Sequence, residues 1–440
     1  MPKSLGFLGI LCITGVGVFC HVTSVLAATY YVSANGNDSN PGTSSQPWAT
    51  LQKAADTVRA GDTVFVNDGN YRGLQISTSG AQASPITFKA YAQNALINSG
   101  GPTGDGIRLQ NVSYITIEGF RLQNFSERCI AARGATPEAP MHGNVVRGNI
   151  CRNAASDGFY LSEFADGLVE KNEIYDSGLA DLTHGIYLAN AGSKNTIIRG
   201  NLLSGTSGFQ TNADLSIGGD GLVTGLVLEN NTIVNSTGNG IWLDGVQNSL
   251  IQNNLIYGSG HHAFRAGQVD GAQGPKNLKI VNNTFLAGSS GAAIKLTEDG
   301  GGHIIFNNIL LVDSGGETSI TTGNTNFQSN ANVVSNSFSS NGGSTIRTLA
   351  QWQAAGYDGN SILSSAASLF LNPSAADYHL KAGAPAINAG LASLGTASAP
   401  EADIAGAPRP QGAAFDIGAY EYYQGNPPLA PAAPKNLRLR

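Results

Sequence analysis

A short phrase of alternating apolar and polar residues recurs through the middle of the chain. Its clearest copies are DGFYL (157–161), HGIYL (184–188), SGFQT (207–211), NGIWL (239–243), HAFRA (262–266) and AAIKL (292–296), with weaker upstream copies DGIRL (105–109) and RCIAA (128–132). In the first of these, apolar Phe159 and Leu161 flank Tyr160. The alternation predicts a β-strand whose third and fifth residues point inward and whose fourth points outward.

A second apolar run, ending in asparagine, alternates with this phrase. The asparagines are Asn149, Asn172, Asn201, Asn231, Asn254, Asn283 and Asn308, and they lie 23 to 30 residues apart. A repeat of this length with variable insertions predicts a solenoid of stacked parallel strands, a parallel β-helix. We expect each asparagine to sit in a tight turn with a left-handed backbone and to bond to the equivalent amide one turn away.

The N-terminal segment 29–73 predicts a strand, a turn-rich loop, a helix at 48–58 (WATLQKAADTV) and another strand. Its pattern YYVS-NG-D-NPGT-PW-TLQKA-AGDTV resembles the cap of secreted right-handed β-helix proteins of the pectate-lyase-like superfamily. The resemblance implies an all-β, right-handed parallel β-helix. In it, residues 28–75 form a cap whose short helix plugs one end of a solenoid at 76–345.

The pattern loosens after Leu311, and a last irregular coil is expected before residue 345. A short helix is predicted at 348–358, and segments 369–390 and 403–422 resemble the closing segment of bacterial secreted β-helix proteins. We expect residues 346–425 to cover the other end of the core. Residues 426–440 form a predicted Pro/Ala-rich linker.

Residues 1–27 predict a secretory signal peptide, because Lys3 precedes a long apolar run that ends in small residues. The protein is then extracellular or periplasmic. We expect a monomer with no membrane span, since no other stretch is apolar enough. The net charge of −6, without a basic stripe, argues against nucleic acid. Cys129 and Cys151 remain after cleavage, and sequence alone leaves their pairing open.

The composition agrees with this fold, with 57 glycines and only 12% charged residues, as expected for many short strands and turns. The predicted outward column reads Arg108, Ala131, Tyr160, Tyr187, Gln210, Trp242, Arg265 and Lys295, and Asp244 falls in the second outward set. Aromatic faces stack on sugar rings and cations pair with carboxylates. We therefore predict a polysaccharide groove whose binding residues are Tyr160, Gln210, Trp242, Asp244 and Arg108. The alternative is cross-strand aromatic packing beneath a loop.

Two reaction centres are candidates within this groove. Arg265 and Lys295 resemble the Lys/Arg pair of β-helix alginate lyases, which serves as base and acid. Alternatively, Tyr187 and His184, with Tyr160, have the chemistry to carry protons. Strict alternation turns His184 inward unless the turn before its strand rotates it out, so a structural role is the alternative.

Calcium is the metal that the resemblance implies, because pectate lyases of this superfamily use it. The longest insertion, NADLSIGGDGL (212–222), carries Asp214 and Asp220, which are the candidate ligands. The alternative is that these are solvated loop acids.

The leading hypothesis is a secreted polysaccharide lyase that cleaves alginate or pectate by β-elimination. Three alternatives stay open: a uronate C5-epimerase, a glycoside hydrolase and a non-catalytic carbohydrate-binding surface protein. A hydrolase needs two carboxylates across the scissile bond, and Asp244 stands alone in the outward sets.

Overall fold

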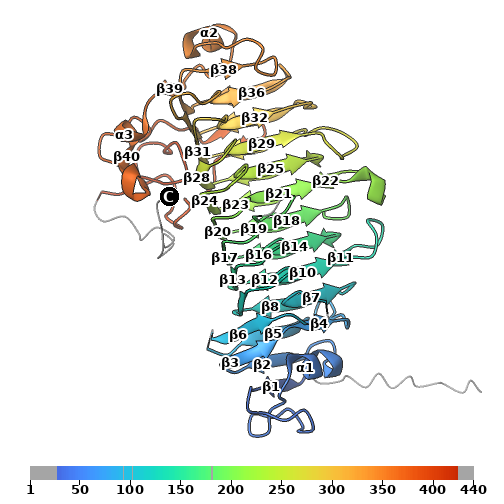
Figure 1. The fold of residues 1–440 in the computed structure, drawn as a ribbon. Coiled ribbons are helices and arrows are strands. Elements are labelled where there is room, and N and C mark those ends of the chain that lie inside the picture. Colours follow the sequence, from blue (N-terminus) through green and yellow to red (C-terminus); the bar gives the residue numbers. More distant parts are fainter. Residues whose placement is uncertain (1–26, 93, 102, 180–181, 425–440) are drawn as a thin grey trace, which may run out of the picture.

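The computed structural model describes residues 27–424, apart from positions 93, 102, 180 and 181. The predicted signal peptide, except its last residue, and the predicted linker lie outside the described residues. The described chain winds into a right-handed parallel β-helix with few helices (Figure 1), which confirms the predicted fold class. Among the described residues, no helix is both long and apolar enough to cross a membrane.

Three parallel sheets run the length of the solenoid. Sheet A contains β1 (Thr29–Val32), β2 (Thr63–Val66), β5 (Ile86–Ala90), β8 (Ile115–Glu118), β12 (Val145–Arg147), β16 (Leu168–Glu170), β19 (Ile197–Arg199), β23 (Val227–Glu229), β27 (Leu250–Gln252), β30 (Lys279–Val281), β33 (His303–Phe306) and β36 (Phe327–Asn330). The first strands of the predicted cap therefore already belong to the solenoid.

Sheet B follows sheet A in each coil, after the asparagine turn. It contains β3 (Gly69–Arg72), β6 (Ala95–Ser99), β9 (Arg121–Gln123), β13 (Ile150–Arg152), β17 (Glu173–Tyr175), β20 (Leu202–Ser204), β24 (Thr232–Val234), β28 (Leu255–Ser259), β31 (Thr284–Ala287), β34 (Ile309–Val312), β37 (Val333–Val334) and β39 (Ile362–Leu363).

Sheet C is built from the recurring phrase. It contains β4 (Leu74–Ile76), β7 (Ile107–Gln110), β10 (Ile130–Arg133), β14 (Phe159–Ser162), β18 (Ile186–Ala189), β21 (Phe209–Asn212), β25 (Ile241–Asp244), β29 (Phe264–Gly267), β32 (Ile294–Leu296), β35 (Ile320–Thr321) and β38 (Phe338–Ser339). Phe159 and Leu161 are fully buried, as the alternation predicts, and they join one continuous core.

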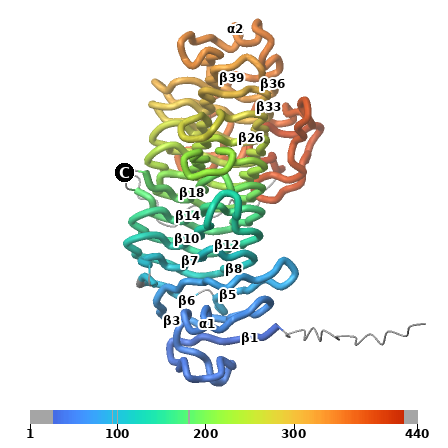
Figure 2. Tube along the Cα trace, turned by 90° about the vertical axis from the view of Figure 1, so that its right-hand side faces the viewer, coloured from blue at the N-terminus to red at the C-terminus, as the bar shows by residue number. Residues whose placement is uncertain are grey.

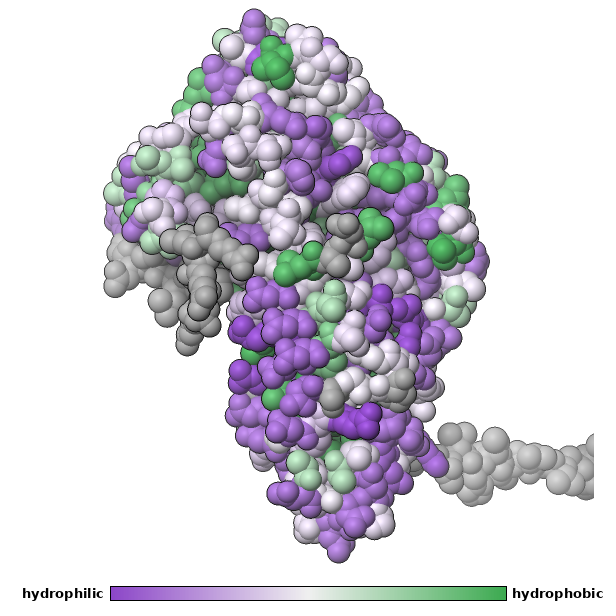
Figure 3. All heavy atoms as spheres, viewed as in Figure 1, coloured by the Kyte–Doolittle hydropathy of each residue, from purple (hydrophilic) through white to green (hydrophobic). Residues whose placement is uncertain are grey.

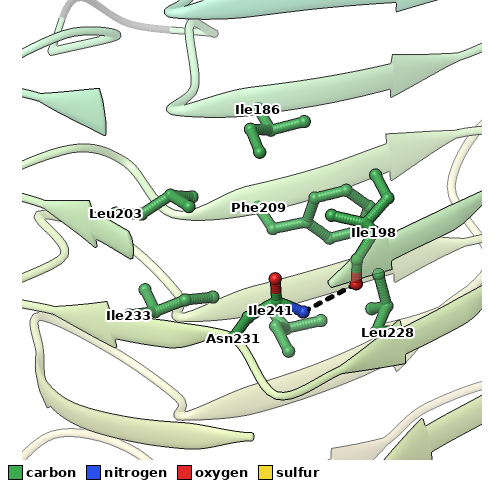
Figure 4. A pocket seen from close by; sticks show the side chains of 8 residues that line it. All are labelled: Ile186, Ile198, Leu203, Phe209, Leu228, Asn231, Ile233 and Ile241. Atoms are coloured by element: carbon green, nitrogen blue, oxygen red, sulfur yellow. Dashed lines mark hydrogen bonds between the residues drawn. The ribbon is translucent and has the colours of Figure 1, made fainter. Parts of the chain in front are cut away.

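The interior of the solenoid is closely packed. Figure 4 shows its middle, where a void of only about 10 Å³ is lined by seven apolar side chains and Asn231. A space this small and this apolar does not hold an ordered water. The solenoid interior is therefore filled by side chains, and any ligand must bind outside it.

The asparagines after sheet A form a ladder. The Asn201 side-chain amide donates to Oδ1 of Asn231 at 3.0 Å, and the Asn231 amide donates to Oδ1 of Asn254 at 3.0 Å. The predicted amide bonds between turns are confirmed. The predicted left-handed backbone is wrong for the ladder asparagines. The preceding residue adopts it instead, as Asn230 does with φ of 57°, so the asparagine side chain points into the turn.

Both ends of the core are closed by helices. Helix α1 (Leu51–Thr57) buries Leu51, Ala54 and Ala55 at the first coils. Helix α2 (Leu349–Ala354) buries Trp352 at the other end, where its ring lies 5.2 Å from that of Phe338. The predicted plug and short helix are thus both found.

The expectation that the closing segment covers the far end of the core is wrong for residues 366–422. This segment lies along the outer face of sheet B, beside the middle and upper coils (Figure 2). It contains α3 (Ala366–Leu369), η2 (Pro373–Ala375) and the hairpins β40 (Phe370–Asn372) with β41 (Asp377–Leu380) and β42 (Ser393–Leu394) with β43 (Ala397–Ser398). The sheet B side chains Leu255, Tyr257 and Ile309 are apolar and face outward, so they need this cover.

Loops between sheets C and A carry the remaining elements. These are β11 (Met141–His142) with β15 (Phe164–Ala165), β22 (Val223–Thr224) with β26 (Val246–Gln247), and η1 (Leu215–Ile217). Cys129 and Cys151 form a disulfide inside the coil, which resolves the pairing that sequence left open.

Candidate active site

The outward column of sheet C is continuous in register. Arg108, Ala131, Tyr160, Tyr187, Gln210, Trp242, Arg265 and Lys295 are consecutive Cα partners from β7 to β32. At about 4.8 Å per strand, the column extends for about 34 Å. The structure therefore provides one row of aromatic, cationic and amide side chains of a length that suits an extended polymer.

A pocket of about 500 Å³ opens over the middle of this row. Its lining includes Gln210 and Trp242 of the outward column, with His184 and Val269 from the adjoining loops. Nine large hydrophobic side chains are exposed among the described residues, and five belong to loops around this pocket: Leu179, Leu182, Leu215, Ile217 and Val269. Figure 3 shows the face of the molecule seen in Figure 1, where the hydrophobic patches are separated by hydrophilic groups. Leu179, Leu182 and Val269 line the pocket itself, and exposed apolar side chains gathered among polar groups are typical of a binding site.

His184 is turned toward the groove and not into the core. Its backbone N–H donates to Oδ1 of Asp157 at 2.8 Å, and its Nδ1 lies 3.5 Å from the same oxygen. Its ring centre lies 4.9 Å from that of Tyr187. The Asp157 carboxylate makes no hydrogen bond to Nδ1, but its charge favours the tautomer with the proton on that atom and the lone pair on Nε2.

Tyr187 is held beside this histidine. Its ring centre lies 5.6 Å from that of Tyr160 on the preceding strand. Burial, followed by the neighbouring Tyr160, raises the pKa of the Tyr187 phenol, whereas a hydrogen bond with the Asn212 side chain lowers it. The phenol therefore stays protonated at neutral pH, as a proton donor must.

A column of turn residues supports the pair. Asp105, Arg128, Asp157 and His184 each precede the first inward residue of a sheet C strand by one glycine or cysteine. Arg128 Nε lies 3.2 Å from Asp157 Oδ2, and Arg128 Nη1 lies 3.8 Å from Asp105 Oδ1. Sequence reasoning missed the role of Arg128, although its place two residues before Ile130 matches that of Asp157 before Phe159.

The four predicted catalytic residues do not form one centre. Tyr187 lies three strands from Arg265, about 14 Å along the stack. Arg265 stacks on the Trp242 ring at 4.5 Å, and Lys295 Nζ binds Glu317 at 2.8 Å. Because Lys295 is engaged as an ammonium by a carboxylate, this pair is poorly arranged to act as a base.

Asp244 was expected to contact substrate from the outward face, but its carboxylate is buried. It accepts backbone N–H groups of Val269, Asp270 and Gly271 at 2.7, 3.0 and 3.1 Å. Burial raises its pKa, against the lowering effect of these three bonds. Asp244 thus holds the loop at 269–271, and it also lines the pocket, so its predicted contact with substrate stays a prediction.

The calcium candidates do not come together as a metal site. Asp214 caps η1 by accepting the Ser216 N–H at 2.8 Å, and Asp220 binds Lys194 Nζ at 2.7 Å. Within residues 27–424, apart from the gaps given above, no group of three or more His, Cys, Asp or Glu residues has the arrangement to hold a metal ion. These residues do not fit calcium, and no chemical step below is routed through it.

Unpartnered polar atoms gather on this face. Fifteen buried side-chain nitrogen or oxygen atoms of the described residues lack a hydrogen-bond partner, and eight lie on or beside sheet C: Asp105 Oδ1, Arg108 Nε, Arg133 Nε, His184 Nδ1, Asn212 Oδ1, Asn239 Oδ1, Trp242 Nε1 and Arg265 Nε. Burying such atoms without partners costs free energy. Such atoms require an explanation, which bound water or a rearrangement on ligand binding would provide.

Comparisons with known proteins place this geometry in a family. A model described as "Pel9A-like, right handed beta helix region" matches residues 30–214, and one described as "Right handed beta helix region" matches residues 214–366. A search of curated protein sequences found no match.

Several solved structures have a similar fold. Pectate lyase Pel9A is similar over 90% of this chain and 96% of its own, with a TM-score of 0.65 and 16% identity. XylC in complex with xylose is similar over 72% and 76%, with a TM-score of 0.50 and 13% identity. At such identities the similarity shows the fold alone. The family models, the register of the three sheets and this shared fold together identify the chain as a right-handed parallel β-helix protein of the pectate-lyase-like superfamily.

Proposed function

We propose that the protein is an exported polysaccharide lyase that cleaves a uronate polymer, alginate or pectate, by β-elimination. The observation that carries the proposal is the contact of the His184 ring, which lies beside Asp157, with the protonated phenol of Tyr187 in the outward column of sheet C. Elimination needs both a proton acceptor and a proton donor at neighbouring positions. The shared fold with a pectate lyase agrees with this chemistry.

In the proposed reaction, Nε2 of His184 removes the proton at C5 of the uronate. The electron pair forms the double bond between C4 and C5, and the bond between C4 and the glycosidic oxygen breaks. The Tyr187 hydroxyl gives its proton to that oxygen, which becomes the new hydroxyl end. Gln210 and Trp242 bind the sugars on the pocket side of the pair.

Inverting hydrolysis is less well supported by this site. It needs an acidic carboxyl group and a second free carboxylate across the bond. Asp244 is committed to three loop N–H groups, and Asp157 is committed to Arg128 and the His184 backbone. These two carboxylates are therefore engaged in holding other groups, whereas Asp270, which also lines the pocket, is exposed and accepts a bond from Asn212.

The direct test is to incubate the protein with alginate, pectate and a neutral glycan, with and without added calcium, and to follow the ultraviolet absorbance of newly formed unsaturated uronate. We expect absorbance to rise with one acidic polymer. The calcium arm tests the predicted cofactor requirement separately. No absorbance change and no new reducing ends would reject lyase chemistry and leave proton exchange at C5 or binding alone.

Variants then test the two roles. Tyr187→Phe and His184→Ala should each lower kcat by about 10²- to 10⁴-fold, the range for loss of a positioned acid or base, with KM changed far less. Tyr175→Phe is the matched control, because Tyr175 is also a partly buried outward tyrosine with a raised pKa but lies on sheet B. Equal loss in all three variants would show a general folding effect and contradict the assignment.

A further inference from the structure

Three arginines converge on the face of β10. Arg128 lies just before this strand and Arg133 is its last residue, while Arg108 is the Cα partner of Ala131 on the neighbouring strand β7. The guanidinium carbons of Arg128 and Arg133 lie 4.9 and 4.7 Å from the centre of the Tyr160 ring. One aromatic ring therefore brings two of the three cations together.

Ala131 explains how the cations fit there. It is the one small residue in the outward column from Arg108 to Lys295, and it has no exposed surface although its position in the strand points outward. Longer neighbouring side chains must therefore cover it. A methyl group at this position leaves room for arginines from both ends of the strand to gather beside Tyr160.

The three arginines of this cluster differ in whether they form ion pairs with carboxylates. Arg128 pairs with Asp157 at 3.2 Å and with Glu127 at 3.0 Å, and Arg108 lies 3.7 Å from Asp105. Arg133, by contrast, has no ion pair within the part of the chain that the structure describes.

Arg133 is also held in an unfavourable setting. Burial and then the nearby Arg128 lower the pKa of its guanidinium, while Tyr160 and Asp105 act in the opposite direction. The Nε atoms of Arg133 and Arg108 both lack a hydrogen-bond partner. These two Nε atoms are buried, so the remaining guanidinium nitrogens would have to meet a ligand, and a half-buried cation beside two others is stabilised when an anion binds.

We propose that Arg133 and Arg108 form an anion subsite that binds the acidic group of a sugar unit in the groove. The group is a carboxylate or a sulfate ester by charge, and the planar guanidinium fork favours the carboxylate of a uronate. The identification of the ligand as a polysaccharide rests on the proposed function. Tyr160 contacts both Arg133 and Tyr187, so Arg133 lies two strands from the proton-transfer pair, and the subsite selects acidic over neutral polymers.

Equilibrium binding tests the subsite without requiring turnover. Isothermal titration would compare five probes: oligogalacturonate, oligomannuronate, the carboxyl-reduced neutral form of each, and a sulfated oligosaccharide without uronate. The wild-type protein should bind one of the uronate probes at least about tenfold more tightly than its neutral form. Arg133→Gln should abolish that ratio by weakening only the acidic probe, and Arg133→Lys should restore part of it.

Arg152→Gln is the matched control, because Arg152 also stacks on a tyrosine, Tyr175 at 4.0 Å, but lies on sheet B. It should leave the ratio unchanged. If Arg133→Gln melts early, Arg133→Lys keeps the charge, loses the fork and still tests the assignment by its affinity for the acidic probe.

The outcomes separate the subsite from the lyase. An unchanged ratio in folded Arg133→Gln and Arg133→Lys overturns the subsite, even if the protein cleaves uronates. A lost ratio supports it, even if no unsaturated product ever forms and the lyase proposal fails. Tighter binding of the sulfated probe than of either uronate overturns the choice of carboxylate.

Discussion

A single buried side chain, His262, can make the stability of the fold depend on pH. It is buried behind Arg265 and Lys295, and its Nδ1 accepts the Ala292 N–H at 2.9 Å. Burial, and then Lys295, lower its pKa to about 4, against the opposite effect of Glu317. The folded protein thus keeps this imidazole neutral in a range where the unfolded chain would protonate it.

This difference predicts a pH-dependent loss of stability. With a pKa near 6.5 in the unfolded chain and about 4 in the folded one, His262 costs nothing above pH 6.5 and progressively destabilises the fold as pH falls toward 4. The total is about 3 kcal/mol. His262→Gln keeps an acceptor for Ala292 but does not titrate. Urea unfolding from pH 7 to 4 should show wild type losing stability relative to the variant, and a constant difference would contradict the assignment.

Residue by residue, sequence reasoning succeeded where the period of two applied. The inward and outward columns of sheet C follow directly from alternation, which is why Tyr160, Tyr187 and Trp242 were placed correctly on one face. It failed at turns, where alternation has no meaning. The orientation of His184 and the role of Arg128 depend on loop geometry that local sequence does not encode.

At the scale of single elements, sheets A and C differ in how their outward charges are satisfied. On sheet A, Lys89, Glu118, Arg147, Glu170, Arg199 and Glu229 alternate in sign, with neighbouring charged atoms 2.7 to 3.8 Å apart. On sheet C, Arg133 and Arg265 stack on aromatic rings and have no ion pair among the described residues. Charged side chains that already form ion pairs with one another have little affinity left for a ligand. Which sheet binds ligand therefore depends on how its charged residues are paired as well as on their type.

The asparagine ladder offers a prediction at this scale. Asn231 is buried, and its side chain exchanges hydrogen bonds with Asn201, Ile198 and Asn254. Asn231→Ala leaves these buried partners unsatisfied and should lower the free energy of unfolding by about 4 kcal/mol. Urea unfolding at constant pH measures it.

The adjacent turn residue supplies the control. Asn230 has a φ of 57° and is half-exposed, so Asn230→Gly suits its backbone and should change stability by less than about 1 kcal/mol. If both variants behave alike, the ladder bonds are not the source of the stability.

At the scale of the whole molecule, each coil of a solenoid contacts only the coils next to it. A destabilising substitution should therefore affect only nearby coils. Trp352 is fully buried in the end cap, against Phe338 and Phe327, and its Nε1 donates to Asp358 at 2.9 Å. Trp352→Ala should cost about 3–5 kcal/mol. Its effect should be local to the last coils.

Hydrogen exchange read by mass spectrometry tests this locality. Trp352→Ala should speed exchange in β33 to β38 and leave β7 to β18, with the groove, protected. The exposed Leu363→Ala serves as the control in the same region. Faster exchange spread evenly over every coil would show that the solenoid opens as one unit.

The segment 366–422 sets the order in which this molecule can be assembled. Its backbone carbonyls accept bonds from Asn253, Asn282 and Asn307, the turn residues of three successive coils. Those coils must form before the segment has a surface to bind, so the segment docks last. Once docked, the segment links these separate coils. A force applied at the C-terminus must therefore detach the segment before the coils that it contacts can unfold.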